Sequence, residues 1–368
     1  MRTAKVGLLG VVCFLAGCNS TSKMTPAQSA IRAYNGTASV GDFLTISIDS
    51  AALTITYKDY TNGDMGTLAY TVNADGIYTI TDPNGNLLDA YEVPGTALMV
   101  EAAKAGPNHN TVALITAIES TPSTINTFAG QNFNYMQFRT ASGGLEVGTI
   151  SIDAQANITH AGYWPFGALQ QPPNQFGSGS FAASAVQEDP SGNFFTLSEN
   201  GGSQDYIFGT QNGFFAVDTG NGTILSLPKA AGKTFAASTA GTYTALFYEK
   251  LNAQTGQNNI ESGTPVEGKA TLTIGAGGTV TITDSQSNTL ASGTLVAVAD
   301  TAYMYDGTQN TLPDALHGMF TFRTTTGSSR QDVFLSFQGN AVVFSSFQTG
   351  LPLQNGGSYT YFYGVGLK

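Results

Sequence analysis

The feature that most constrains this chain is a short alternating segment that occurs three times. Thr45-Ile-Ser-Ile-Asp49 recurs unchanged as Thr149-Ile-Ser-Ile-Asp153, and a looser copy follows as Thr271-Leu-Thr-Ile-Gly275. Each copy alternates apolar residues with Thr or Ser, which is the period of a β-strand with one buried face. A turn and a second alternating segment follow each copy, so the repeated unit is a set of antiparallel strands.

A second alignment supports the same division of the chain. Ile77–Asp82 aligns with Phe194–Glu199 at an offset of 117 residues, and the same offset carries Ala97–Glu101 onto Phe214–Asp218 without a gap. Two independent pairs of strands at one spacing indicate that whole modules, and not single strands, are repeated.

The third copy is recognised by the match of Phe215–Val217 to Val342–Phe344. We therefore expect three tandem modules at 35–122, 126–229 and 233–368, each near the size at which a single core is self-sufficient. The many Asn-Gly, Asp-Gly and Gly-Gly turns, and the lack of a long amphipathic helix after the first residues, predict an all-β fold. The expected architecture is three antiparallel β-meander modules, barrel-like or sandwich-like.

The first eighteen residues form a secretory signal. Arg2 and Lys5 precede the apolar run Val6–Leu15, which is too short to span a bilayer comfortably. The run ends in Leu15-Ala16-Gly17-Cys18, which resembles the lipobox of bacterial lipoproteins. The resemblance implies a signal peptide at 1–17 and lipidation of Cys18, while an ordinary signal peptide with an incidental Cys is the alternative.

The lipoprotein interpretation also predicts the state of the cysteines and the cellular location. The chain has two cysteines, and Cys13 would be removed with the signal while Cys18 would carry the lipid, so no disulfide or thiolate chemistry would remain. Residues 18–34, polar and small, would be the lipidated tether. Asn19 is not the Asp that retains such lipoproteins at the inner membrane, so the resemblance implies an outer-membrane lipoprotein of the bacterial envelope.

The charge balance excludes one class of partner. The net charge is −11 and no run of basic residues exists, whereas nucleic-acid binding requires clustered Lys and Arg. Attraction to anionic lipids fails for the same reason, so the expected membrane contact is the N-terminal lipid alone.

Most of the mature chain resembles a β-repeat module of secreted and lipid-anchored bacterial envelope proteins that commonly lack an assigned activity. The segments that carry the resemblance are Phe133–Phe138, Gly148–Asp153, Gly179–Ala183, Gly192–Thr196 and Tyr206–Phe208. The first module departs from it by having no clear opening strand, and the third by an insertion around Leu251–Glu267. The resemblance implies a β architecture and a location in the cell envelope, and it implies no catalytic residues.

Residues with catalytic or metal-binding potential are few. His109 lies in a turn-like loop, His160 at the end of a strand where the third copy has Ile282, and His317 beside a glycine. No His-Glu-x-x-His motif occurs, and we expect no catalytic residue, no cofactor and no metal site. The acids at repeated strand ends are best explained as turn caps; these are Asp49, Asp82, Asp153 and Asp284.

Two loops and one aromatic group are the remaining candidates. Asp59–Asp64 and Asp82–Asn86 carry closely spaced oxygen ligands, although neither has the spacing of an EF-hand. Tyr163, Trp164 and Phe166 form an aromatic group that would suit a ligand platform, or else a plug over the end of a module.

Two classes of function follow from these observations. The first is a non-catalytic envelope protein that binds a glycan or a surface protein, or acts as a spacer. The second is a carboxylate-dependent polysaccharide hydrolase with an unidentified site. The irregular segments Trp164–Gly179 and Leu251–Glu267 carry few acids, which favours the first class and the expectation that the protein is not an enzyme.

Overall fold

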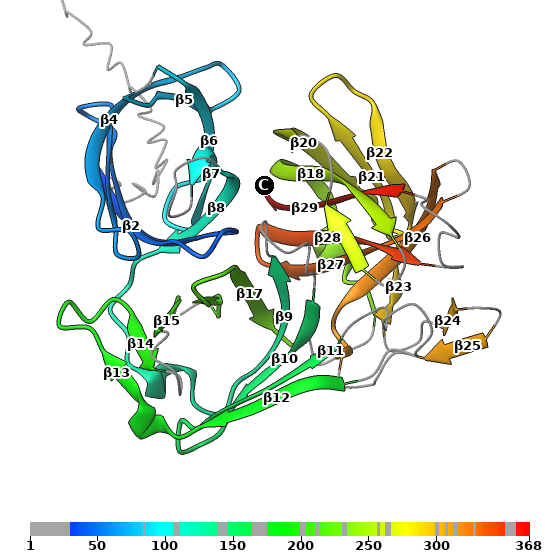
Figure 1. Ribbon diagram of the computed structural model, residues 1–368. Coiled ribbons are helices and arrows are strands. Elements are labelled where there is room, and N and C mark those ends of the chain that lie inside the picture. Colours follow the sequence, from blue (N-terminus) through cyan, green and yellow to red (C-terminus); the bar gives the residue numbers. More distant parts are fainter. Residues whose placement is uncertain are drawn as a thin grey trace, which may run out of the picture.

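The computed structural model describes most of the chain from residue 30 onward. The described residues are 30–83, 85–105, 111–138, 146–163, 175–198, 204–210, 213–229, 234–255, 258–261, 266–298, 302–305, 308–311, 316–326, 329–349 and 358–368. Within them the fold is all-β, with three barrel-like antiparallel sheets placed around a common centre (Figure 1).

The first sheet is a closed barrel, drawn in blue to cyan in Figure 1. Each strand pairs with the next, and β1 also pairs with β8, which closes the sheet without free edges. Its strands are β1 Ile31–Ala38, β2 Phe43–Asp49, β3 Thr54–Asp59, β4 Met65–Val72, β5 Ile77–Thr81, β6 Leu87–Val93, β7 Ala97–Ala105 and β8 Thr111–Glu119.

The second sheet has nine strands in the order β12-β11-β10-β9-β17-β16-β15-β14-β13. Its strands are β9 Asn132–Phe138, β10 Glu146–Ile152, β11 Ile158–Tyr163, β12 Gln175–Phe181, β13 Val186–Glu188, β14 Phe195–Ser198, β15 Gln204–Gly209, β16 Phe215–Asp218 and β17 Thr223–Pro228. Short 3-10 turns precede β9 and separate β12 from β13, η1 Ile125–Phe128 and η2 Ala183–Ala185.

The third sheet has the order β22-β21-β20-β18-β29-β28-β27-β26-β23, preceded by the 3-10 turn η3 Ala237–Thr239. Its strands are β18 Gly241–Thr255, β20 Val266–Ile274, β21 Thr279–Asp284, β22 Thr289–Thr294, β23 Val296–Ala297, β26 Phe320–Thr326, β27 Ser329–Gln338, β28 Ala341–Thr349 and β29 Ser358–Leu367. β19 Asn258–Glu261 extends β18 as a hairpin, and β24 Ala302–Tyr305 pairs separately with β25 Thr308–Thr311.

All three sheets follow one plan. In each sheet the first strand lies between the second and the last strand. The second and third sheets have a break in strand pairing after their fourth strand, leaving β19 aside, whereas the barrel is paired continuously at that point. The repeated Thr-Ile-Ser-Ile segment forms the second strand each time. Its first apolar residue faces an aromatic residue of the first strand, and these pairs are Ile46 with Tyr34, Ile150 with Phe133 and Leu272 with Tyr243.

One sequence interpretation is wrong. The first module does have an opening strand, β1, which begins at Ile31 within the range expected for the tether. This strand could not be recognised from the sequence because the polar residues Arg32, Asn35 and Thr37 interrupt its apolar alternation. Each of them hydrogen-bonds to a distant residue, so the polar strand is stable only in its tertiary setting.

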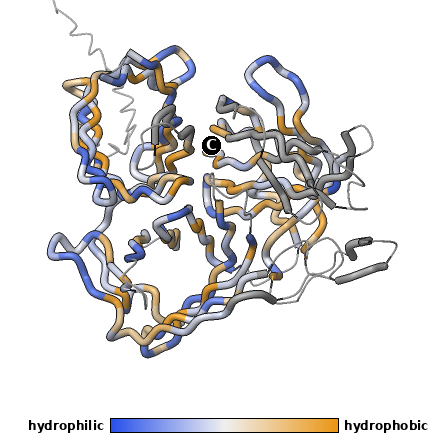
Figure 2. The backbone as a smooth tube through the Cα atoms, in the orientation of Figure 1, coloured by the Kyte–Doolittle hydropathy of each residue, from blue (hydrophilic) through white to orange (hydrophobic). Residues whose placement is uncertain are grey.

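Each sheet encloses its own apolar core. Ile46 and Ile48 belong to the cluster inside the barrel, Ile150 to that of the second sheet, and Leu272 and Ile274 to that of the third. Figure 2 shows hydrophobic and hydrophilic colours alternating along the barrel strands, as expected for strands with one face in a core.

A fourth cluster lies between the sheets, and we call it the central cluster. It combines residues from all three, among them Phe43 and Met99 of the barrel, Phe208 of the second sheet, and Leu246 and Phe334 of the third. Such a shared core packs the three sheets against one another through side chains, while no strand ladder joins them in the described part of the chain.

Candidate functional site

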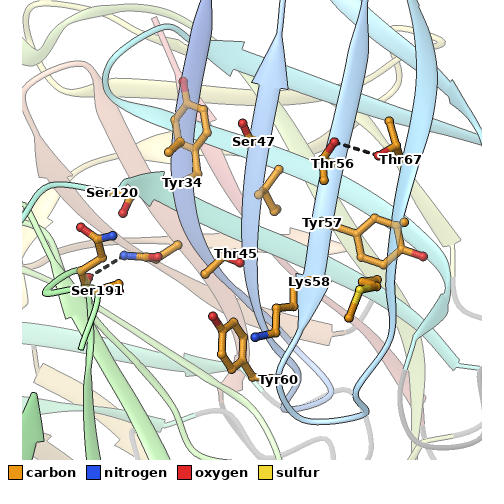
Figure 3. Close-up of a pocket in the computed structure, with 16 residues that line it drawn as sticks. Tyr34, Thr45, Ser47, Thr56, Tyr57, Lys58, Tyr60, Thr67, Ser120 and Ser191 are labelled. Atoms are coloured by element: carbon orange, nitrogen blue, oxygen red, sulfur yellow. Dashed lines mark hydrogen bonds between the residues drawn. The ribbon is translucent and has the colours of Figure 1, made fainter. Parts of the chain in front are cut away.

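The candidate site is a groove of about 480 Å³ on the outside of the barrel, which we call the outer groove. The floor carries side chains of β1 to β4 that point away from the barrel core, such as Thr45 and Ser47, which alternate with the buried Ile46 and Ile48. The opposite wall comes from the turn between β13 and β14 of the second sheet, through Ser191 and Asn193 (Figure 3).

The lining of the outer groove combines hydroxyl groups with apolar and aromatic groups. The hydroxyls come from Thr45, Ser47, Thr56, Thr67, Ser120 and Ser191, and the apolar and aromatic surface comes from Ala33, Ile46, Met65, Tyr57 and Tyr60. The Thr56 and Thr67 hydroxyls hydrogen-bond at 2.9 Å across neighbouring strands. The Lys58 ammonium lies 4.0 Å from the centre of the Tyr60 ring, a cation–π contact at one end of the groove (Figure 3). None of the described lining side chains is acidic.

The two walls of the groove are fixed to each other. The Asn35 amide donates a 2.7 Å hydrogen bond to the Asn193 carbonyl, and the Ser123 N–H donates one of 3.1 Å to the Gly192 carbonyl. Behind the wall, the Phe43 ring stacks on Tyr206 with centroids 4.5 Å apart. The groove is therefore preformed, which reduces the ordering cost of binding.

A second set of polar residues lies inside the barrel. Arg32 forms a bidentate ion pair with Glu92, with its Nε at 2.6 Å from Oε1 and an Nη at 2.7 Å from Oε2. The Tyr34 and Tyr78 hydroxyls also donate to the two Glu92 oxygens. The Glu92 side chain has no exposed surface, so this network satisfies a charge that would otherwise be very costly to bury.

The hydrogen-bond network shifts the pKa of each of its four ionisable side chains. Burial alone would raise the pKa of Glu92, but the hydrogen bonds from Arg32, Tyr34 and Tyr78 outweigh it and hold that pKa below its usual value. Burial and the hydrogen bond to Glu92 raise the pKa of both tyrosines, while the bond to Glu92 raises the pKa of Arg32. The ion pair is thus kept ionised at neutral pH and acts as a structural tie between β1 and β6.

The residues predicted from the sequence fall mostly outside the described part. Cys18, Trp164, Phe166 and His109 lie outside the described residues, and Tyr163 is the last residue of β11, with its side chain outside them. Within the described chain, no helix is long and apolar enough to cross a membrane.

The two described histidines lie in structural settings. His160 stacks against Phe181 on the inner face of the second sheet, with ring centroids 6.0 Å apart, as expected for a face-filling residue. The backbone carbonyl of His317 accepts a 2.8 Å hydrogen bond from Asn134 and so joins the third sheet to the second.

The prediction that strand-end acids cap turns is confirmed. Asp153 Oδ1 accepts from the N–H of Gln155 and Asn157, and its Oδ2 accepts from the Asn157 amide. Asp284 accepts in the same way from the N–H and the side-chain amide of Asn288, four residues later. Asp82 accepts from the N–H and the side-chain amide of Asn86 at the same spacing. These hydrogen bonds lower the pKa of Asp153 and Asp284.

The loops considered for calcium use their oxygens in the same manner. Asp59 Oδ1 accepts from the N–H groups of Thr61 and Asn62, at 2.8 and 2.9 Å. Among the described residues, no three His, Cys, Asp or Glu side chains converge in a way that could hold a metal ion.

The outer groove itself was missed by the sequence interpretation. Its hydroxyl residues were recognised only as the polar half of alternating strands. The signal available in the sequence was the unusual share of Thr and Ser at those positions, but the second wall comes from a turn more than a hundred residues away in the chain.

Comparison with known proteins gives weak likenesses only. No family model and no curated protein matches the chain. Among solved structures, a double mutant of transferrin binding protein B from Haemophilus parasuis is 9% identical, covering 93% of this chain and 77% of that one, with a TM-score of 0.24. Transferrin binding protein B from Neisseria meningitidis is 13% identical, covering 89% and 65%, with a TM-score of 0.28. At these TM-scores neither likeness carries a conclusion about the fold or the function of this chain.

Proposed function

We propose that this protein is a non-catalytic binding protein of the bacterial cell envelope that holds a polyhydroxylated ligand, a glycan, in the outer groove. The single observation that supports the proposal is the composition of that groove: hydroxyl and amide groups and one ammonium beside aromatic rings and other apolar surface, with no described carboxylate, between two walls tied to each other. Hydroxyl and amide side chains both donate and accept hydrogen bonds, which matches the hydroxyl groups of a sugar.

The chain divides in this proposal into a lipid anchor and three modules. Cys18 carries the lipid after removal of 1–17, the tether places the modules at the outer membrane, and the barrel with the second sheet presents the groove. The three sheets span 31–119, 132–228 and 241–367, which supports the division into modules at 35–122, 126–229 and 233–368.

The hydrolase alternative finds no support in the groove. Glycoside hydrolysis generally requires two carboxyl groups on either side of the scissile bond, at about 5 to 9.5 Å from each other. The described lining offers none. A surface protein as partner is a second candidate, which the same binding experiment distinguishes.

The test is a glycan and peptidoglycan array probed with the full chain purified in detergent. Thr45→Val and Ser47→Ala remove two hydroxyls from the groove floor, the first while keeping the β-branched shape that strands favour and the second without adding bulk. Thr71→Val is the matched control, because Thr71 is an exposed barrel threonine outside the groove. Binding that is lost in the two groove variants and kept in the control supports the proposal.

Array binding that is equal in all three variants would contradict it, as would the absence of any glycan ligand. The anchor is tested separately by metabolic palmitate labelling. Cys18→Ser should abolish the label, and unchanged labelling would refute the lipidation of Cys18.

A further inference from the structure

Three polar residues occupy the same place in the three sheets. Glu101 aligns with Asp218 in the 117-residue repeat, and the match of Phe215–Val217 to Val342–Phe344 places Ser345 at the equivalent position. In each sheet the residue lies on the strand before the last, β7, β16 or β28, two positions after a member of the central cluster. Side chains two apart on a strand share a face, so all three point out of their own sheet, toward a neighbouring one.

Asp218 joins the second sheet to the barrel. Thr37 of β1 donates a 2.6 Å hydrogen bond to its Oδ2, and the Gly220 N–H donates one of 2.9 Å to its Oδ1. The Asp218 side chain is fully buried, and the charged groups that act on it are the carboxylates of Asp42 from the barrel and Asp205 from β15. Burial, with these two like charges adding to it, raises the pKa of Asp218 to about 7 despite its two hydrogen bonds.

The phenol of Tyr206, also on β15, is a further titratable group of this junction, and Asp59 and Tyr60 of the barrel lie near it. Burial and the nearby carboxylates of Asp218 and Asp59 raise the pKa of Tyr206, so that it stays neutral when Asp218 ionises.

Glu101 lies where the barrel meets the third sheet. Beside it, Asp89 of β6 and Lys269 of β20 form an ion pair of 2.9 Å across the junction. Oε1 of Glu101 is buried and has no hydrogen-bond partner among the described residues. Burial raises the pKa of Glu101 to about 7, with repulsion from Asp89 adding to the rise and Lys269 opposing it.

The third junction, between the second and third sheets, carries no such carboxyl at this position. Ser345 is fully buried and does not titrate in the range that proteins experience. Next to it in the ladder, Tyr363 stacks on Phe138 of the second sheet, with ring centroids 4.5 Å apart. This junction is apolar at its centre, because Met136 and Val343 also belong to the central cluster.

We propose that the barrel is held to the other two sheets by two proton-dependent junctions, at Asp218 and Glu101, so that deprotonation releases the barrel while the second and third sheets stay together. The reason is that the three equivalent positions, Glu101, Asp218 and Ser345, do not all carry a carboxyl group. Both junctions made by the barrel bury a carboxyl group, and the one junction that does not involve the barrel buries a serine.

The direction of the pH dependence follows from the raised pKa values. A carboxyl whose pKa is higher in the docked state binds its proton more tightly there, so docking is strongest at low pH and weakens as the pH rises toward and through 7. With exposed carboxyl groups as the undocked reference, each residue changes the docking equilibrium on the order of 50- to 100-fold between pH 5 and pH 8.

Release of the barrel would also affect ligand binding, a consequence that rests on the proposed function. The floor of the outer groove belongs to the barrel and its far wall to the second sheet, so separation of the two divides the groove. The test below uses no ligand, and its outcome is therefore independent of whether the groove binds a glycan.

The experiment measures distances between the sheets by pulsed electron paramagnetic resonance on the full chain, in which Cys13→Ser and Cys18→Ser remove the native thiols. Spin labels are placed in pairs at Asp75→Cys in the barrel, Gln155→Cys in the second sheet and Gln286→Cys in the third, all exposed turn residues. Between pH 5 and pH 8, the two distance distributions that include residue 75 should broaden or lengthen. The distribution between residues 155 and 286 should remain unchanged and is the internal control.

The matched variants are Asp218→Asn and Glu101→Gln, which keep the shape of each side chain and cannot ionise. In the double variant all three distributions should be the same at pH 5 and pH 8. The proposal is overturned if the unmodified residues give no pH dependence, if all three distances change together, or if the double variant still responds to pH.

Discussion

Gly41 offers a direct test of how the barrel and the second sheet meet. It lies in the β1–β2 turn with φ +93°, and a Cβ added there would come within 2.2 Å of the Gly220 carbonyl carbon and 2.3 Å of the Asn221 nitrogen. These are backbone atoms of the β16–β17 turn, which cannot rotate out of the way as a side chain can. Gly41→Ala should therefore force the two turns apart.

The expected cost has two parts. The left-handed backbone conformation alone costs a non-glycine residue about 1 to 2 kcal/mol. Separation of the turns also removes the Thr37 hydrogen bond to Asp218, worth about 1 to 2 kcal/mol, and loosens the stacking of Phe43 on Tyr206, worth about 1 kcal/mol. The free energy of unfolding should fall by about 3 to 5 kcal/mol.

Gly76→Ala is the matched control. Gly76 also has a positive φ, +75°, but a Cβ there meets nothing within 4 Å, so this variant should lose only the conformational part, about 1 to 2 kcal/mol. Urea unfolding followed by far-ultraviolet circular dichroism measures both. Equal losses in the two variants would refute the contact between the turns.

Three further predictions concern single side chains of the sheets and of one turn. Glu92→Gln should lower the free energy of unfolding by about 3 to 5 kcal/mol, measured in urea at pH 7, because it removes the buried carboxylate that pairs with the partly buried Arg32 guanidinium; a loss below 1 kcal/mol would contradict the structural role of this ion pair. Ile150→Asp places an unpaired charge in the core of the second sheet, so limited proteolysis should cut first within 126–229; cleavage that begins equally in all three sheets would argue against separate modules. Asp284→Ala removes a solvent-facing turn cap and should lower the melting temperature less than Ile150→Asp does, and an equal or larger loss would show that the turn does more than its hydrogen bonds indicate.

The local structure of the strands and turns can be predicted from the amino-acid sequence. The alternation in Thr45–Asp49 and its copies is a local property of the strand, so the position of β2, β10 and β20 and the burial of their isoleucines and leucines could be predicted. Turn-capping acids such as Asp153 were predictable for the same reason, since their partners lie within four residues. The repeat also predicted that the three sheets share a plan, because equal sequences have equal strand order.

The roles of the polar residues of β1 depend on contacts with distant parts of the chain. Arg32 and Thr37 interrupt the apolar alternation expected of a strand. Their hydrogen-bond partners are Glu92 and Asp218, which lie 60 and 181 positions away in the chain. The outer groove, the central cluster and the two buried carboxyls at the junctions of the barrel arise in the same way, from surfaces of different modules. Local periodicity fixes which face of a strand is apolar, but contacts between modules depend on how the finished sheets pack, and no short-range pattern encodes that.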